Sequence, residues 1–306
     1  MPQHPDGIML ARVHQPLRHN AALAVLADKL EELDSQLQEE LAHCGVLTVR
    51  LDREAELWIG VDQRMRPSLS RTSLKVLVAI EPPEVKQQSV DGFDLVLTWQ
   101  IDHLRAHRNA HLFVPATPWL VPEEWSEYHG DVKKCSLGFL RGSKRRTSGH
   151  QLRHEVWGAR MEIASKMRIP VDFLEGGVSR KERNHQFSSQ FVLVIENSRH
   201  PNYFTEKLLD ALLARCVPIY WGCENLREFF DTEGVIEVRG GLEEIMAVCQ
   251  GLTEEDYVAR ARSLASNFEL AKQYAGDFGQ RVQAAVGRAL RHQNSCGQGD
   301  AHLTAQ

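Results

Sequence analysis

A polar segment after a run of five apolar residues carries two charged side chains that could do chemistry. The run FVLVI occupies residues 191–195, and a helix is expected to begin near Tyr203, after a polar loop. Glu206 and Lys207 then fall in the first two turns of this helix. Because a helix N-terminus carries about half a positive charge, Glu206 suits the position and Lys207 does not. A bound anion would account for the lysine.

The expected start of the helix supplies further groups for such an anion. Asn202 is the expected N-cap, which leaves the backbone N–H groups of residues 203–206 pointing away from the helix. These donors and the Lys207 ammonium could together hold a diphosphate. The alternative is an ordinary amphipathic helix on which Lys207 forms a surface ion pair with Asp210.

Apolar runs alternate with amphipathic stretches along the chain, as is typical of α/β proteins whose parallel sheets are covered on both faces. Strands are expected near 46–51, 55–61, 74–80, 93–98, 111–115, 134–140, 169–174, 190–195, 217–221 and 234–238. Helices are expected near 20–43, 149–167, 203–215, 240–250, 253–266 and 268–291. Ligands of open α/β sheets bind beyond the carboxyl ends of strands, which is where the 203–215 helix would start.

The length of 306 residues predicts two domains. We expect an N-terminal domain over 1–135, a C-terminal domain over 136–292 and a flexible tail over 293–306. The last long helix of the C-terminal domain could pack back on the N-terminal domain.

Composition excludes several classes of protein. The net charge of −5 gives no basic excess for nucleic-acid binding. No apolar run is long enough to span a bilayer, and the N-terminus has no secretory pattern. The six cysteines show no C-x-x-C spacing, which favours free thiols and a cytoplasmic location over disulfides or zinc. No D-x-D motif suggests a metal-bound diphosphate, and no G-x-G-x-x-G suggests a dinucleotide, so we expect neither a metal site nor a cofactor.

The segment ENSRHPNYFTEKLLDALLARCVPIYWG resembles the signature of glycosyltransferase family 10, the α-1,3/1,4-fucosyltransferases. The resemblance implies a GT-B architecture, in which two Rossmann-like domains face a central cleft, with GDP-fucose bound mainly by the C-terminal domain. It also implies donor-binding roles for four residues. Asn197 and Tyr203 would surround the nucleotide, Glu206 would accept ribose hydroxyls, and Lys207 would bind the diphosphate.

The resemblance extends upstream over KKCSLGFLRGSKRRTSGHQLRHEV, where Arg153 falls at the position of a family arginine. An arginine fork and Lys207 would hold a diphosphate from two sides and neutralise it as it leaves. The alternative for Arg153 is a solvated helix residue. The neighbouring basic residues Lys144, Arg145 and Arg146 are typical of a solvated loop.

In the N-terminal half, AIEPPEV followed by FDLVLTW is similar to a second family segment. The resemblance makes Glu81 the general base that deprotonates the acceptor hydroxyl, a task that suits a carboxylate. Glu84 is the rival candidate, and a solvated glutamate at a strand end is the structural alternative. The family's acidic stretch after the aromatic position is here QIDHL, so acceptor contacts inferred from that stretch do not carry over.

These residues predict an inverting glycosyltransferase that moves L-fucose from GDP-fucose to a glycan hydroxyl, in protein glycosylation or polysaccharide modification. A transferase of the same fold that uses another nucleotide sugar is one alternative. A catalytically silent nucleotide- or carbohydrate-binding protein is the other. Sequence leaves the acceptor, the linkage and the oligomeric state open.

Overall fold

The structure is a computed structural model that describes residues 22–25, 57–61, 74–130 and 133–299. The expected strand near 46–51 and most of the expected helix 20–43 lie outside the described residues. The described part of that helix is a correction, because Ala22–Val25 form a strand, β1. β1 pairs antiparallel with β2 (Leu57–Val61), so strand pairing overrides the helical spacing of the local leucines.

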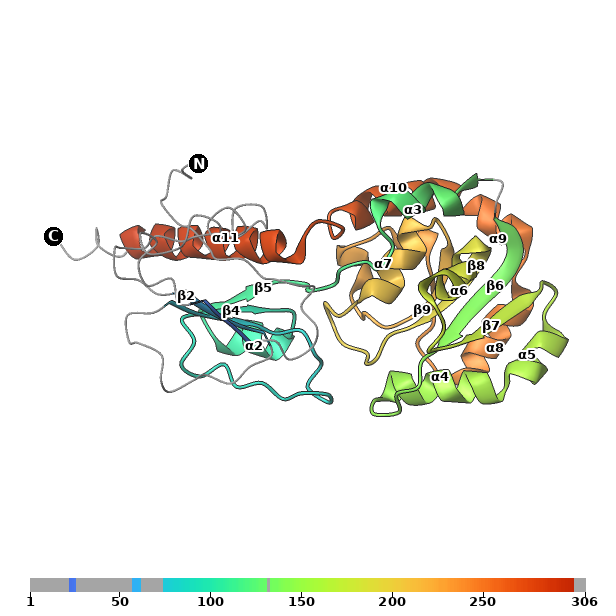
Figure 1. Cartoon of the computed structure of the whole chain (residues 1–306), viewed down its shortest axis with the longest axis horizontal. Coiled ribbons are helices and arrows are strands. Elements are labelled where there is room, and N and C mark those ends of the chain that lie inside the picture. The colour runs from blue at the N-terminus through green and yellow to red at the C-terminus, as the bar shows by residue number, and fades with distance from the viewer. Residues whose placement is uncertain (1–21, 26–56, 62–73, 131–132, 300–306) are drawn as a thin grey trace. The chain divides into compact units, whose positions relative to one another are not determined.

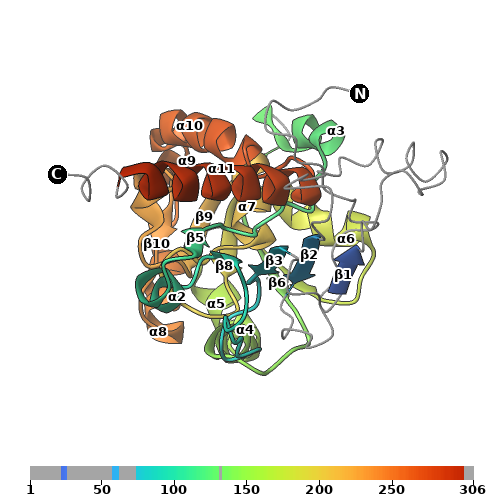
Figure 2. The ribbon, with the colours of Figure 1, turned by 90° about the vertical axis from the view of Figure 1, so that its left-hand side faces the viewer.

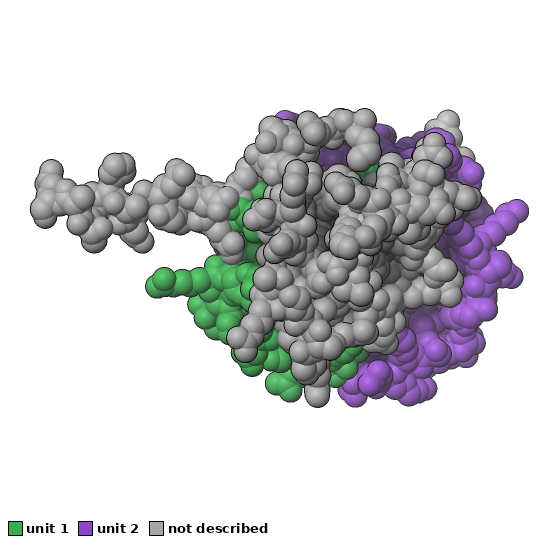
Figure 3. All heavy atoms as spheres, turned by 60° about the vertical axis from the view of Figure 1, so that its left-hand side comes forward, with its two compact units in different colours: residues 1–115, 276–306 green, residues 116–275 purple. Residues whose placement is uncertain are grey.

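Contacts divide the chain into two compact units, coloured separately in Figure 3. The first unit comprises residues 1–115 and 276–306, and the second comprises residues 116–275. The boundaries expected from sequence were 135/136 and 292/293, so the chain enters the second unit earlier and leaves it earlier than those positions.

The sheet of the first unit has the order β1-β2-β3-β4-β5. Its remaining strands are β3 (Leu74–Val78), β4 (Leu95–Thr98) and β5 (Ala110–Leu112), each parallel to its neighbour. Among the described residues of this unit, the helices are α2 (Ile101–Ala106) and α11 (Phe278–Gly299), and α11 lies along the sheet (Figures 1 and 2). Val282 and Val286 of α11 pack on Val76 and Leu97. The last helix thus covers the N-terminal sheet.

The second unit holds a five-stranded parallel sheet of order β10-β9-β8-β6-β7. The strands are β6 (Lys134–Arg141), β7 (Val171–Glu175), β8 (Ser189–Ile195), β9 (Val217–Trp221) and β10 (Ile236–Glu237). The helices are α3 (Pro122–Trp125), α4 (Ser148–Gly158), α5 (Arg160–Lys166), α6 (Arg180–Asn184), α7 (Glu206–Leu213), α8 (Leu242–Gly251), α9 (Glu254–Ala259) and α10 (Ala261–Lys272).

The central strand β8 is buried along its whole length, as its continuous apolar sequence predicts. In Figure 1, α4, α5 and α8 lie along one side of this sheet and α7 and α10 along the other. Leu152 of α4 and Ile245 of α8 pack on Phe191 and Ile219. The α/β class expected from sequence is therefore confirmed in both units, whereas the facing of two domains across a cleft stays a prediction.

Helix α7 is tied to the start of the second unit by a buried carboxylate. Asp210 is 3% exposed, and its Oδ1 accepts the backbone N–H groups of Trp119 and Leu120 at 2.7 and 2.9 Å. The expected alternative of a surface pair between Asp210 and Lys207 is wrong, because the Asp210 side chain faces the interior. Burial raises the pKa of Asp210 to about 7, although the two N–H donors oppose the shift.

We predict that Asp210→Asn removes a pH-dependent loss of stability. Because the folded pKa lies above the ordinary value, folding favours the neutral carboxyl. Its contribution is present below about pH 4 and lost as the pH rises through about 7. The asparagine keeps the acceptor oxygen and does not ionise. From pH 4 to pH 8 the free energy of unfolding of the variant, relative to that of the wild type, should therefore rise by about 2–4 kcal/mol. Urea denaturation across this range measures the gain, and a constant difference would contradict it.

Candidate active site

The sheet of the second unit reverses its strand order beside β6. After β6 the chain adds β7 on one side, and β8 then returns on the other side of β6. The helices that follow β6 and β8 are α4 and α7, so both start at the carboxyl edge of the sheet. Such a switch point is where open parallel sheets bind ligands, as we expected for the 203–215 helix.

The N-terminus of α4 is fixed directly against the end of β8. Thr147 is the N-cap of α4, and its hydroxyl donates to the backbone oxygen of Asn197. The Gly149 N–H donates to the same oxygen at 3.0 Å. A Cβ at position 149 would collide with the Glu196 carbonyl oxygen, so only glycine allows this approach. The contact sets the position of every α4 side chain relative to the β8–α7 loop.

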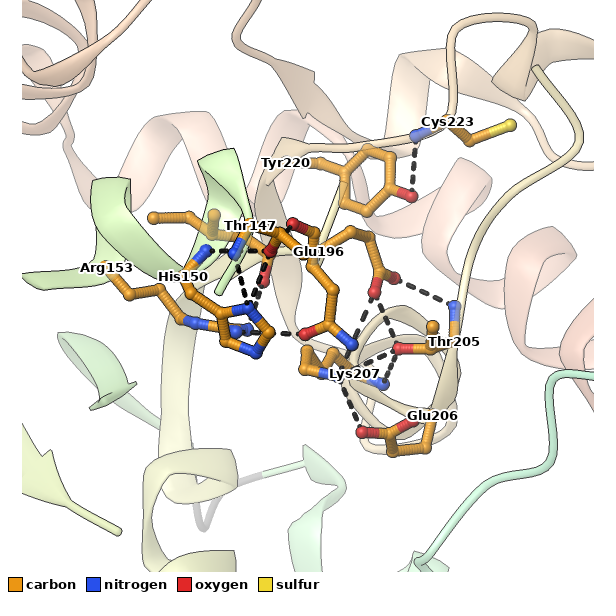
Figure 4. A network of polar contacts seen from close by, with 11 residues as sticks. Thr147, His150, Arg153, Glu196, Thr205, Glu206, Lys207, Tyr220 and Cys223 are labelled. Atoms are coloured by element: carbon orange, nitrogen blue, oxygen red, sulfur yellow. Dashed lines mark hydrogen bonds and ion pairs between the residues drawn. The ribbon is translucent and has the colours of Figure 1, made fainter. Parts of the chain in front are cut away.

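Arg153 projects from α4 onto this loop rather than into solvent. It is 5% exposed, which rules out the solvated alternative. Its guanidinium donates to the Ile195 carbonyl oxygen at 2.8 Å and to Asn197 Oδ1 at 2.9 Å (Figure 4). Its buried Nε has no hydrogen-bond partner among the described residues. The guanidinium thus lies beside Asn197, and its expected contact with a diphosphate stays a prediction.

The start of α7 differs from the expectation. The helix begins at Glu206 with Thr205 as N-cap, not near Tyr203 with Asn202 as N-cap. Asn202 instead adopts a left-handed turn with φ 61°, in which its N–H donates to Asn225 Oδ1 at 2.7 Å. Asparagine tolerates this conformation, so a turn takes the place of the expected first helical turn. Lys207 is therefore the second residue of α7.

A fully buried glutamate holds the cap of α7. Glu196 is 0% exposed and accepts the Thr205 N–H at 2.9 Å and the Thr205 hydroxyl at 2.6 Å (Figure 4). Sequence marked Glu196 only as the end of the apolar run. Glu196 directly follows a central strand, and this position could have indicated its role, because a buried carboxylate there can fix the following loop.

The Lys207 ammonium lies between two carboxylates. Its Nζ is 2.7 Å from Glu206 Oε1 and 3.9 Å from Glu196 Oε2, and it also donates to Thr205 Oγ1 at 3.1 Å. The side chain remains 28% exposed. An anionic ligand is thus not the only reason for a lysine at this helix start, because Glu206 and the buried Glu196 already lie within 4 Å of its ammonium. Lys207 nevertheless reaches solvent at the switch point, where a second anion could meet it.

Burial and charge act in opposite senses on this cluster. Burial raises the pKa of Glu196, and Lys207 opposes that shift only in part. Burial also acts to raise the pKa of Glu206, but the Lys207 ammonium and its hydrogen bond outweigh burial and hold the pKa below its usual value. Glu206 is therefore a carboxylate at neutral pH and can accept hydroxyl groups.

The remaining predicted residues fall in two places. Tyr203 is 4% exposed and lies edge-on to His200, with ring centroids 6.4 Å apart. Glu81 lies in the first unit, three residues after β3, and is partly buried, whereas Glu84 is exposed. The structure thus brings Arg153, Asn197, Glu206 and Lys207 into one region, and the roles of all six residues stay predictions. Lys144, Arg145 and Arg146 are exposed, as expected.

Neither a metal site nor a membrane span is found in the parts of the chain that the structure describes. No group of three or more His, Cys, Asp or Glu residues there could hold a metal ion. None of the described helices combines the length and the apolar character needed to cross a bilayer.

Comparisons with known proteins confirm the family resemblance for the second unit. Residues 155–257 match the family model "Glycosyltransferase family 10 (fucosyltransferase) C-term". An Alpha-(1,4)-fucosyltransferase of Arabidopsis thaliana is 38% identical over 68 residues, which are 22% of this chain and 17% of that protein. Alpha-(1,3)-fucosyltransferase FucT of Helicobacter pylori is 36% identical over 64 residues, or 20% and 13% of the two chains. The matched segments are thus less than a fifth of these relatives.

Solved structures of similar proteins include an α1,3-fucosyltransferase with GDP and one with GDP-fucose. The first has a TM-score of 0.48 at 14% identity, covering 81% of this chain and 90% of the other. The second has a TM-score of 0.46 at 15% identity, covering 72% and 80%.

We predict that Gly149→Ala disrupts the site through the contact between α4 and β8. The added methyl group would push α4 away from the Glu196 carbonyl, at a cost of about 1–3 kcal/mol in the free energy of unfolding. Gly158→Ala is the matched control at the other end of the same helix, where a Cβ meets nothing within 4 Å. Urea denaturation of both variants tests this, and equal stabilities would contradict the close approach.

Proposed function

We propose that this chain, whose residues 155–257 belong to the C-terminal domain of glycosyltransferase family 10, transfers L-fucose from GDP-fucose to a hydroxyl of a glycan acceptor. One observation carries the proposal. Arg153 of α4 and Lys207 of α7 lie at the switch point, on strand–helix units whose strands β6 and β8 are neighbours in the sheet. Lys207 is within the family-matched residues 155–257, and Arg153 stands just before them. The family match supports L-fucose as the transferred sugar, and the two cations support a donor in which the sugar is linked to a diphosphate.

The charges suggest how each residue contributes to donor binding. A diphosphate entering beside Lys207 would share the ammonium with Glu206, so the ion pair holds the lysine in position before the ligand arrives. Glu206, kept ionised by Lys207, would accept ribose hydroxyls. Arg153 and the start of α7 would add positive potential from the two sides of Asn197.

In the reaction, the acceptor oxygen attacks the anomeric carbon while the bond to the diphosphate breaks, which inverts the configuration. Glu81 takes the proton of the acceptor hydroxyl. Arg153 and Lys207 stabilise the negative charge that grows on the departing GDP, an interaction that strengthens in the transition state. The chain's own residues thus supply both the base and the neutralisation of the leaving group.

We predict that GDP-fucose and GDP raise the melting temperature of the protein, because a ligand that binds only the folded state stabilises it. UDP-, ADP- and CMP-sugars at the same concentration are the controls and should have little effect. A stronger shift with another nucleotide sugar would replace the donor assignment. Binding of GDP-fucose without transfer to any acceptor in a glycan panel would favour a silent binding protein.

We predict that Glu81→Gln lowers turnover by about a hundredfold or more and leaves GDP affinity nearly unchanged. Glutamine keeps the shape of the side chain but cannot take the proton. Glu84→Gln, three residues along the same loop, is the matched control and should retain activity. The opposite result for the two variants would move the base to Glu84.

A further inference from the structure

His150 is a histidine of the site that neither the motifs nor the proposed reaction uses. It is the third residue of α4 and is 3% exposed. Its Nδ1 lies 2.6 Å from Thr147 Oγ1 and 3.3 Å from the Thr147 backbone nitrogen. Among the described residues none forms a hydrogen bond with Nε2, and in Figure 4 no dashed line ends on this atom. One ring nitrogen is thus engaged by the N-cap and the other is open.

Cations surround this imidazole on several elements of the second unit. Arg153 and His154 lie on the same helix, Lys144 on the β6–α4 loop and Lys207 on α7. The carboxylates of Glu196 and Glu206 pair with Lys207. Burial, followed by these cations, lowers the pKa of His150 to about 4, so the free protein holds a neutral ring.

The Thr147 hydroxyl can serve as a hydrogen-bond acceptor for a charged ring. The Thr147 hydroxyl donates to the Asn197 backbone oxygen. A proton on His150 Nδ1 can therefore point to Thr147 Oγ1, which forms a chain from the imidazole to the loop after β8. The Thr147 N–H, 3.3 Å from Nδ1, can donate to this atom only when it carries no proton, so the charged ring gives up that longer contact. In the imidazolium, the Nδ1 proton then has an acceptor within the protein, and only the Nε2 proton needs one from outside.

We propose that His150 is a further diphosphate-binding residue, which takes up one proton from solvent when the nucleotide binds and donates Nε2–H to a phosphate oxygen. The inference rests on the proposed function, because it places the diphosphate between Arg153 and Lys207. An anion at that place opposes the neighbouring positive charges which, after burial, lower the pKa of the ring, and so favours its protonation. The step forms no covalent bond, and the proton returns to solvent when GDP leaves.

The sign of the pH dependence follows from the direction of proton uptake. A group that gains a proton on binding strengthens binding as the pH falls, until the free protein is itself protonated near pH 4. GDP-fucose suits the test, since its diphosphate diester has no group that titrates between pH 5 and 8. We expect wild-type affinity for GDP-fucose to be about five- to tenfold higher at pH 5.5 than at pH 8.

His150→Asn is the decisive variant. The asparagine amide can place a polar atom beside Thr147, where Nδ1 lies, but it has no group at the position of Nε2. We expect its affinity for GDP-fucose at pH 5.5 to fall about fivefold or more below wild type, and its pH dependence to flatten. Calorimetry in two buffers of different ionisation enthalpy should count close to one proton taken up by wild type at pH 5.5 and close to none by the variant.

His154→Asn is the matched control on the same helix, because both ring nitrogens of His154 already have partners in Arg141 and the Lys144 carbonyl oxygen. It should keep the wild-type proton uptake. His150→Gln, whose amide reaches the place of Nε2, should recover part of the affinity without the proton uptake. Melting temperatures identify any variant that fails to fold.

Two outcomes separate this inference from the proposed function. If wild type binds GDP-fucose and His150→Asn binds it equally well at every pH, the role of His150 is wrong and the transferase proposal stands. If wild type binds no GDP ligand, both are overturned.

Discussion

The candidate site depends on a buried glutamate that is hydrogen-bonded to a helix cap and lies close to a cation. Glu196 is fully removed from water at the end of the central strand, and the Lys207 ammonium lies 3.9 Å away. Two hydrogen bonds from Thr205 complete its partners and fix the start of α7. Burying a charge is costly unless it is paired and hydrogen-bonded, so this group ties the loop, the helix cap and the lysine into one unit. The position of Lys207 at the switch point is a consequence of that requirement.

The same loop also fixes the second cation. The backbone oxygen of Asn197 accepts from Gly149 and Thr147, and its side chain accepts from Arg153. Both helices that follow the central strands are therefore anchored on residues 195–197, and their positive N-termini start from one place. A ligand with two adjacent phosphates meets groups already held in position, which lowers the cost of binding because little has to be ordered. The loop after the central strand thus holds the groups proposed to bind the diphosphate before the ligand arrives.

Sequence predicted the α/β class, most strands of the second unit and the grouping of Arg153, Asn197, Glu206 and Lys207, because these follow from local patterns and one family signature. It missed features that depend on distant partners. Asn202 was expected as an N-cap, but its turn is held by Asn225, a residue far along the chain. Asp210 was placed on a polar face, although Trp119 and Leu120 bury it. Sequence explained Lys207 by a bound anion. Its contact with the buried Glu196 could not be predicted, because a local sequence pattern does not show which glutamates are buried.

The affinity of Lys207→Met for GDP, measured by calorimetry, tests the central claim most directly. Methionine has a similar length without the charge, and Lys207→Arg retains a cation as the control. Melting temperatures of both variants check that Glu196 remains accommodated. The account predicts that the methionine variant loses about 1.5–3 kcal/mol of GDP binding free energy, the typical worth of a hydrogen bond to a charged group, and that arginine restores part of it. A folded Lys207→Met protein that binds GDP as tightly as wild type would contradict it.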